Sequence, residues 1–354
     1  MTEAAMLNID KLYESVAAKG HVCVGLDTSV EYIPKAVYQT KNIYAGNSSA
    51  NNNSDAEAVL NYNIALIEAT FDIAACYKVQ IAYYEAMGVP GLRAYAETLR
   101  YIRQKNGLAI ADIKRGDISD TAQRYAKAHF DGEFEADFVT LSPYMGMDSV
   151  EPWLEYVTRK EKGAFVLMRT SNKGMRDFEY LKLEGGSPPL ASAAFQASSA
   201  TPPVRRLYHA VGDKLAGLAA AHPGAHGYGA FGAVVGCTER EEAAEIRAAY
   251  PNLFFLIPGY GAQGGAADDA ALLLREGNGG VVNASRSILK AWSVELAKAG
   301  EDPDIAKISI KDAAEAARRA VIEMRDAIRV AIHTPIHTAI HIAEEKQAVT
   351  GKTQ

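Results

Sequence analysis

Residues 108–121 read LAIADIKRGDISDT, an apolar run that ends in charge. Asp112 and Lys114 are two residues apart, so a strand would place both side chains on the same face. Charges inside an apolar strand are costly to bury unless they are paired. A satisfied ion pair within the core would explain Asp112 and Lys114 alone. The same kind of charge recurs, however, at Asp27 in VGLD and at Lys78 in CYKVQ, and Asp117 follows just beyond residue 114.

The rest of the chain repeats the pattern of a short apolar run followed by an amphipathic helical segment. We expect strands at 21–27, 75–80, 108–114, 137–142, 164–171, 233–237, 254–258 and 280–285. Helical patterns lie between them, among others at 91–104, 119–130, 149–160 and 239–249. This alternation indicates a parallel sheet, and the nearly continuous hydrophobicity of the strands indicates that both faces are covered. Eight such units favour an α/β fold of the closed (β/α)8 type, a TIM barrel, over an open doubly wound sheet.

The expected organisation is a single domain over residues 1–354, with its core at about 21–300. An extra helix is predicted at 3–18, before the first strand. A C-terminal helical extension and tail are predicted at 301–354, where the Ala-rich amphipathic segment 311–331 would pack on the barrel exterior.

Two segments interrupt the strand–helix rhythm. Residues 42–55 contain SSANNNSD, and residues 184–203 are rich in Gly, Pro, Ser and Ala. We expect both to be insertions in the loops after the first and fifth strands. The histidines at 333, 337 and 341 recur every four residues, as a metal-binding helix face would require. Pro335 would break such a helix, which favours a solvated tail from about Thr334.

The composition of the chain limits the kinds of partner that we expect it to bind. The 37 Lys+Arg and 43 Asp+Glu residues give a net charge of −6, which argues against a general nucleic-acid binder but not against a small anionic ligand. Cys23, Cys76 and Cys237 each lie in an apolar run, as buried free thiols in a reducing compartment do. Residues 1–10 lack the features of a secretory signal, and no apolar stretch has the length of a membrane span. We therefore expect a cytoplasmic protein without a membrane or nucleic-acid partner.

The strand-end charges point to an active site. In a (β/α)8 barrel the carboxyl ends of the strands carry the catalytic groups, because the loops there vary without disturbing the core. Asp27, Lys78, Asp112 and Lys114 would meet at that end. Asp117 lies beyond its strand, in the turn, and need not face the same way. It could reach across a subunit interface or simply cap the helix that follows.

A phosphate site is predicted after the seventh and eighth strands. PGYGAQGG, residues 258–265, offers glycines that expose backbone N–H groups to a ligand. Arg286, in NASRSILKAW, would begin a helix, where an anion is already favoured and a guanidinium adds a two-pronged grip. These two loops form the usual phosphate site of such barrels. The ligand would then be a phosphate monoester whose other end meets Asp112 and Lys114.

The segment ADIKRGDISDTAQRYA, residues 111–126, resembles the orotidine 5′-phosphate decarboxylase family, whose core pattern is D-x-K-x-x-D-I followed by Thr. The longer bacterial-type (type 2) branch is the better match. The resemblance continues, in family order, through HVCVGLD, YKVQIAYYEAMG, VTLSPYMGMDSVEPW, FVLMRTSNKG, FLIPGYGAQGG and VVNASRSI.

The resemblance implies a homodimer of (β/α)8 barrels that converts orotidine 5′-monophosphate to uridine 5′-monophosphate and CO2, without cofactor or metal, in the last step of de novo UMP synthesis. Lys78, Asp112, Lys114 and Asp117 would form a charged tetrad, with Lys114 as proton donor and Asp117 supplied by the partner subunit. The implied substrate-binding residues are Asp27, Ile118, Thr121, Ser171, Gly261, Gln263 and Arg286. Among these, Asp27 and Thr121 would hold ribose hydroxyls, Ser171 the pyrimidine amide edge, Gln263 phosphate and base, and Arg286 the phosphate.

Two alternatives remain. Related barrels with a similar D-x-K-x-x-D strand act on sugar phosphates as magnesium-dependent decarboxylases or aldolases, and they need a further carboxylate ligand, for which Glu85 is available. The RTSNKG and GAQGG segments favour a pyrimidine nucleotide instead. The second alternative is a nucleotide-binding barrel without catalytic activity, against which the intact tetrad argues.

Overall fold

The computed structural model describes residues 6–35, 55–184, 204–261, 265–302 and 308–333. Eight parallel strands form a closed barrel in chain order, and the last strand pairs with the first. They are β1 (Val22–Gly25), β2 (Cys76–Gln80), β3 (Ala109–Arg115), β4 (Phe138–Leu141), β5 (Gly163–Arg169), β6 (Phe231–Val235), β7 (Phe255–Ile257) and β8 (Gly280–Ala284). The predicted (β/α)8 barrel is confirmed, and every predicted strand overlaps an observed one.

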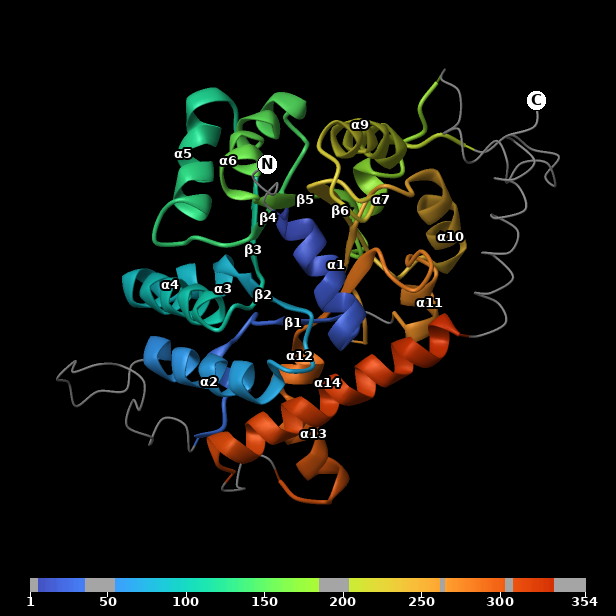
Figure 1. Cartoon of the computed structure of the whole chain (residues 1–354). Helices are drawn as coiled ribbons and strands as arrows, with labels where there is room; N and C mark the ends of the chain where they lie inside the picture. The colour runs from blue at the N-terminus through green and yellow to red at the C-terminus, as the bar shows by residue number, and fades with distance from the viewer. Residues whose placement is uncertain (1–5, 36–54, 185–203, 262–264, 303–307, 334–354) are drawn as a thin grey trace.

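Helices cover the outside of the barrel (Figure 1). With the 3-10 turns (η) included, they are α1 (Asn8–Lys19), η1 (Val30–Tyr32), α2 (Asp55–Thr70), α3 (Ile81–Glu85), α4 (Gly88–Gln104), α5 (Ser119–Phe130), η3 (Met147–Ser149), η4 (Glu151–Trp153), α6 (Glu155–Lys160), α7 (Met175–Phe178), α9 (Leu207–Ala221), α10 (Arg240–Ala249), α11 (Ala267–Ala271), α12 (Arg286–Leu289), α13 (Ala291–Lys298) and α14 (Ile310–Ile332). None of these helices is long and apolar enough to span a membrane.

Some predicted boundaries were wrong. The continuous helix expected at 149–160 is instead two 3-10 turns and the short α6, because Pro152 lacks the N–H and crowds the preceding turn of an α-helix. The N-terminal helix begins at Asn8, after an extended Leu7, and α4 begins at Gly88, three residues early, with Pro90 tolerated in its first turn. Apart from Asp55 and Glu184, the predicted insertions lie outside the described residues, as does the tail from Thr334.

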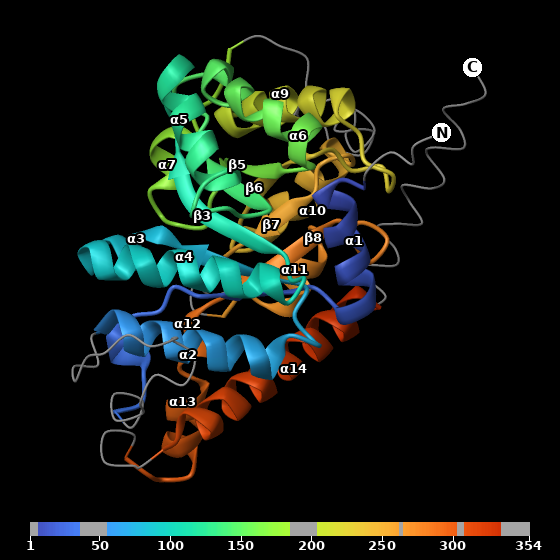
Figure 2. The same ribbon diagram turned by 60° about the vertical axis from the view of Figure 1, so that its left-hand side comes forward.

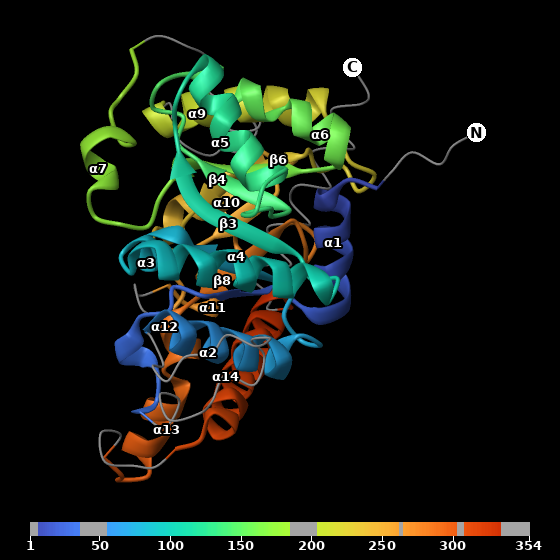
Figure 3. The same cartoon turned by 90° about the vertical axis from the view of Figure 1, so that its left-hand side faces the viewer.

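Alternate residues of each strand face the barrel interior, and their chemistry changes along the barrel axis. Near the amino ends the interior is apolar: Phe138 and Phe165 pack together there, and Leu12 and Val16 of α1 belong to the same cluster. Figure 3 shows α1 at this end of the barrel and α7 at the opposite end. An apolar floor therefore lies beneath the carboxyl ends of the strands, and polar side chains occupy the layer above it.

The C-terminal helix α14 packs on the barrel exterior, as predicted. It runs beside α2 and α13 (Figures 1 and 2) and is in contact with both. Its first turn is capped by Ser309, whose hydroxyl accepts the Asp312 N–H at 3.1 Å. Arg318 forms an ion pair with Asp72, just after α2, with Nη2 and Oδ2 2.8 Å apart. Helix α14 also contacts β1, so the last described helix packs beside the strand at which the barrel closes.

The packing of α14 against the barrel gives a prediction about stability. Ile328 is fully buried in the main core cluster, whereas Val330, two residues later, is 69% exposed. We expect Ile328→Ala to lower the free energy of unfolding by about 2–5 kcal/mol, because it removes buried methyl groups and leaves a cavity. Val330→Ala, the matched control, should change it by about 0.5 kcal/mol or less. Urea denaturation of both variants measures this, and equal losses would mean that α14 is not part of the cooperative core.

Candidate active site

A pocket of about 390 Å³ lies at the carboxyl ends of the strands. Asp27 follows β1, Lys78 lies in β2, Asp112 and Lys114 lie in β3, and Arg286 begins α12 after β8; all five line the pocket. Strand pairing brings the charged positions together, because Gly25 pairs with Lys78 and Gln80 pairs with Asp112. The structure therefore assembles the strand-end charges that the sequence indicated.

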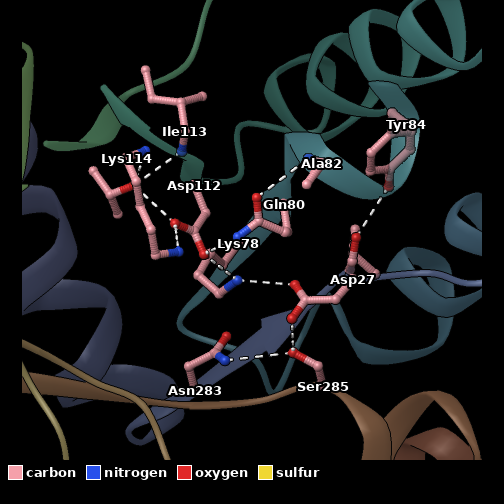
Figure 4. A network of polar contacts seen from close by, with 12 residues as sticks. Asp27, Lys78, Gln80, Ala82, Tyr84, Asp112, Ile113, Lys114, Asn283 and Ser285 are labelled. Atoms are coloured by element: carbon pink, nitrogen blue, oxygen red, sulfur yellow. Dashed lines mark hydrogen bonds and ion pairs between the residues drawn. The ribbon is translucent and has the colours of Figure 1, made fainter. Parts of the chain in front are cut away.

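Four of these charges, those of Asp27, Lys78, Asp112 and Lys114, form a continuous series of ion pairs (Figure 4). The Lys78 ammonium lies 2.9 Å from Asp27 Oδ1 and 2.8 Å from Asp112 Oδ2. The Lys114 ammonium lies 2.6 Å from the other oxygen of Asp112, Oδ1. Opposite charges alternate along this series, so that each buried charge faces a partner of the opposite sign.

Asp112 accepts four hydrogen bonds, which uses every lone-pair position of a carboxylate. Two come from the lysines, and two come from Gln80 Nε2 at 2.9 Å and Thr140 Oγ1 at 2.8 Å. Burial alone would raise the pKa of Asp112, but the charges of Lys78 and Lys114 outweigh it and hold this pKa well below its usual range. Asp112 is therefore a carboxylate at any physiological pH.

The two lysines differ in exposure, and this separates their functions. The Lys78 side chain is 6% exposed, and its ammonium binds two carboxylates. Burial acts to lower the pKa of Lys78, but Asp112 and Asp27 prevail and raise it above its usual value. The Lys114 side chain is 48% exposed, and a single ion pair with Asp112 holds its ammonium. Of the two lysines in this series of ion pairs, Lys114 is therefore the one whose ammonium can face a ligand.

Three polar residues that bind these ion-paired side chains were not predicted from the sequence. Gln80 and Thr140 bind Asp112, and Ser285 donates to Asp27 Oδ2 at 2.9 Å. Gln80 lies two residues after Lys78, so strand alternation could have identified it. Thr140 and Ser285 had only their places at strand ends as a signal. Gly25 makes room for this cluster, because a Cβ there would lie 2.0 Å from Ser285 Oγ.

The segment after β3 lies away from this pocket. Asp117 Oδ1 accepts the neighbouring N–H of Ile118 at 2.9 Å, and Asp117 does not line the pocket of its own chain. Ile118 and Thr121 are exposed and also lie outside the pocket lining. Helix α5 begins after Ile118 without a side-chain capping bond, so Asp117 does not cap it. Within its own chain, the fourth charge of the expected tetrad is separate from the other three.

The predicted phosphate end is in part where the sequence placed it. Ser171, Gly259, Tyr260 and Arg286 line the pocket. Arg286 is exposed, and the described part of the chain offers it no ion-pair partner. Gly261 has a φ of 70°, and its N–H donates to Gly265 O at 2.9 Å, so this amide closes the turn and Gly261 lies outside the lining. Gln263 lies outside the described residues.

The candidate metal ligand lies elsewhere. Glu85 Oε1 pairs with Arg115 Nη2 at 3.1 Å and does not line the pocket. Across the described ranges, no group of three or more His, Cys, Asp or Glu side chains is placed to hold a metal ion.

Fold and site together define a class: a (β/α)8-barrel enzyme with a charged pocket at the carboxyl ends of its strands and an exposed arginine in its lining for an anionic ligand. Residues 20–299 match the family described as Orotidine 5′-phosphate decarboxylase / HUMPS family. This chain belongs to that family.

Similar proteins agree with this assignment. The orotidine 5′-phosphate decarboxylase of Clostridium acetobutylicum is 50% identical over 91% of this chain and 98% of its own length. That of Clostridium perfringens is 51% identical over 90% of this chain and 97% of its own. The solved structure of Leishmania donovani OMP decarboxylase aligns with a TM-score of 0.62 and 29% identity, over 91% of this chain and 100% of that one.

The buried carboxylate gives a pH prediction. The pKa of Asp112 is lowered in the folded chain and is about 3.9 in the unfolded one. Its contribution to stability is therefore present above about pH 4 and is lost as the pH falls toward the folded pKa. Asp112→Asn should lower the free energy of unfolding by about 3–5 kcal/mol at pH 7, because buried ammonium charge loses its partner. Denaturation of both proteins at pH 7 and pH 3 should show that the free energies of unfolding of Asp112→Asn and wild type differ less at pH 3 than at pH 7.

The control is Asp120→Asn, whose side chain is 74% exposed and pairs with Arg124 on the helix surface. This change should alter stability little at either pH. An Asp112→Asn effect that is equal at the two pH values would contradict the ionised state assigned to Asp112.

Proposed function

We propose that this chain catalyses the decarboxylation of orotidine 5′-monophosphate to UMP and CO2, the last step of de novo pyrimidine biosynthesis, without a cofactor. The observation that carries the proposal is the Lys114 ammonium, which is exposed in the pocket and held at 2.6 Å by a fully hydrogen-bonded carboxylate. Sequence identity near 50% to decarboxylases of this name, over almost their whole length, supports the choice of substrate.

The chemistry explains why a fixed cation is needed. When the bond from C6 to the carboxylate breaks, CO2 leaves and the electron pair stays on C6 in an in-plane orbital that the ring π system cannot delocalise. A cation beside C6 stabilises this charge as it develops. The Lys114 ammonium then gives C6 a proton, becomes a neutral amine, and regains a proton from water. Lys78 binds both Asp27 and Asp112, and its charge keeps Asp112 ionised beside the reacting centre.

Repulsion between Asp112 and the substrate carboxylate would contribute a smaller part. At an effective dielectric constant near 20, like charges about 4 Å apart cost about 4 kcal/mol. Enzymes lower barriers by about 8–23 kcal/mol, so relief of this repulsion as CO2 leaves is insufficient alone. We therefore rank stabilisation of the transition state by Lys114 first.

The remaining lining residues fit the other parts of the nucleotide. Arg286 would bind the phosphate, Asp27 a ribose hydroxyl and Ser171 the amide edge of the pyrimidine, while Gln263 would bridge base and phosphate. Binding energy from the phosphate, remote from C6, would help to hold the reacting group in place.

We further propose a homodimer in which Asp117, Ile118 and Thr121 serve the neighbouring pocket. These three residues do not line the pocket described above, although Asp117 is only three residues from Lys114. Tyr144 and Met145, in the adjoining loop after β4, are 79% and 50% exposed, and Ile118 is 41% exposed. Exposed apolar side chains of this kind are typical of interaction surfaces and support the proposed interface. The three free, buried cysteines fit a reducing compartment such as the cytoplasm.

The test of the activity is incubation with orotidine 5′-monophosphate while the ultraviolet absorbance is followed, with and without a chelator. Loss of the substrate spectrum at the same rate in both arms is expected. Activity lost in chelator and restored by magnesium would instead favour the sugar-phosphate class of barrel, and binding without turnover would favour the non-catalytic barrel.

Removal of the proton donor should affect turnover more than binding. We expect Lys114→Ala to lower kcat at least 10²-fold, the usual contribution of a positioned acid, while the Kd for UMP stays within a few-fold of wild type. Lys127→Ala, on the exposed face of α5, is the control and should match wild type. A kcat for Lys114→Ala within tenfold of wild type would exclude Lys114 as the donor.

The composite site predicts complementation between two inactive variants. In a mixed dimer of Asp117→Ala and Lys114→Ala subunits, one site receives both defects and the other receives neither. Random mixing makes about half of the dimers mixed, so activity should approach about a quarter of wild type. Mixing Lys114→Ala with Asp112→Asn should restore nothing, because both residues belong to the same pocket. Absence of recovery in mixed dimers of the first pair would contradict a shared site.

A further inference from the structure

Thr140 occupies an unusual position between Asp112 and Lys114. It lies in β4, is 1% exposed, and lines the pocket. Its hydroxyl accepts the consecutive backbone N–H groups of Ile113 and Lys114, each at 2.9 Å, and donates to Asp112 Oδ1 at 2.8 Å. One donor and two lone pairs are all that a hydroxyl has, so the hydrogen-bonding capacity of Thr140 is fully used at this point.

The backbone of β3 is irregular at the same place. Ala111 pairs with Val139 and Arg115 pairs with Leu141, so residues 112–114 of β3 lie opposite Thr140 alone. Lys114 has a φ of 46°, in the left-handed region that non-glycine residues rarely adopt. Bulges of this kind redirect side chains next to active sites, and such backbone persists only where the surroundings fix it.

The regular pairing of β4 does not provide that fixation. In a continuous ladder a β4 carbonyl oxygen would accept the N–H of a β3 residue. Here the two amide groups at the bulge bind a side chain instead. The same hydroxyl orients Asp112, which in turn holds the Lys114 ammonium at 2.6 Å. Thr140 therefore holds Lys114 at both ends: the backbone directly, and the ammonium through Asp112.

We propose that Thr140 is a positioning residue for the decarboxylation, whose hydroxyl fixes the β3 bulge and so directs the Lys114 ammonium to the reacting carbon. This inference rests on the proposed function for the identity of the reaction. Thr140 need not touch the substrate to act in this way. A misplacement of a catalytic group by about 1 Å can cost about 10²-fold in rate, which sets the scale of the expected effect.

The test compares Thr140→Val with Thr140→Ser. Valine has the shape of threonine without the hydroxyl, whereas serine keeps the hydroxyl and loses only the methyl group. We expect Thr140→Val to lower kcat about 10²-fold with the Kd for UMP within threefold of wild type, and Thr140→Ser to keep kcat within about fivefold. Thr70→Val is the matched control: Thr70 is a fully buried threonine outside the pocket lining, whose hydroxyl bonds to Leu66 O and the Tyr77 hydroxyl, and its loss should leave kcat unchanged.

Two kinetic results would overturn the proposal: a Thr140→Val enzyme with kcat within twofold of wild type, or a Thr140→Ser enzyme as impaired as Thr140→Val. If Thr140→Val does not fold, Thr140→Cys, which supplies only a weak donor and acceptor, takes its place with the same expectations. Wild-type turnover, measured alongside, tests the proposed function separately. A crystal structure of Thr140→Val tests the geometry without any substrate, and an unchanged Lys114 backbone and ion pair would also overturn the proposal.

Discussion

The order of the whole pocket depends on one buried carboxylate and its four donors. Asp112 binds side chains from β2, β3 and β4, so three neighbouring strands are joined at their carboxyl ends by a single charge. A carboxylate in this place is stable only because every lone pair has a partner and two of the partners are cations. The same requirement fixes Lys78, Gln80 and Thr140 in one arrangement each. A rigid, preorganised field is what stabilisation of a developing carbanion needs, because little reorganisation is left to occur during the reaction.

The barrel separates the residues that stabilise it from those that react. Aromatic and aliphatic side chains fill its amino end, where α1 covers them, and the ion pairs of Asp27, Lys78, Asp112 and Lys114 lie in the layer above. One strained residue lies in that upper layer: the backbone of Lys114 is in the left-handed region, which costs about 1–3 kcal/mol and requires support from its surroundings. Burial of the apolar residues beneath the pocket stabilises the fold and offsets this cost, and these residues leave the loops above them free to bind different ligands. The loops at the carboxyl ends can therefore vary without disturbing the packed floor.

The sequence was informative where a single local rule decides the structure. Hydrophobic periodicity located all eight strands and α5, and charges at strand ends located Asp27, Lys78, Asp112 and Lys114. It failed where the structure depends on contacts between segments distant in the chain. The importance of Thr140 comes from a bulge in the neighbouring strand, and no local pattern reveals a bulge. Spacing placed Asp112 and Lys114 on one face, but an irregular backbone brings them together. The pocket that Asp117 serves could not be predicted either, because it depends on where a second subunit lies.

The position of α14 has a consequence for how the chain is made. Arg318 of α14 binds the backbone of Ala69 at the end of α2, 249 residues earlier, and β8 pairs with β1. At about 5–20 residues per second, a ribosome needs on the order of tens of seconds to span those 249 residues. During that interval β1 is an open edge, with free N–H and C=O groups that any other strand could pair with. The barrel can close only after β8 has been synthesised, so the nascent chain carries an unpaired strand edge until then.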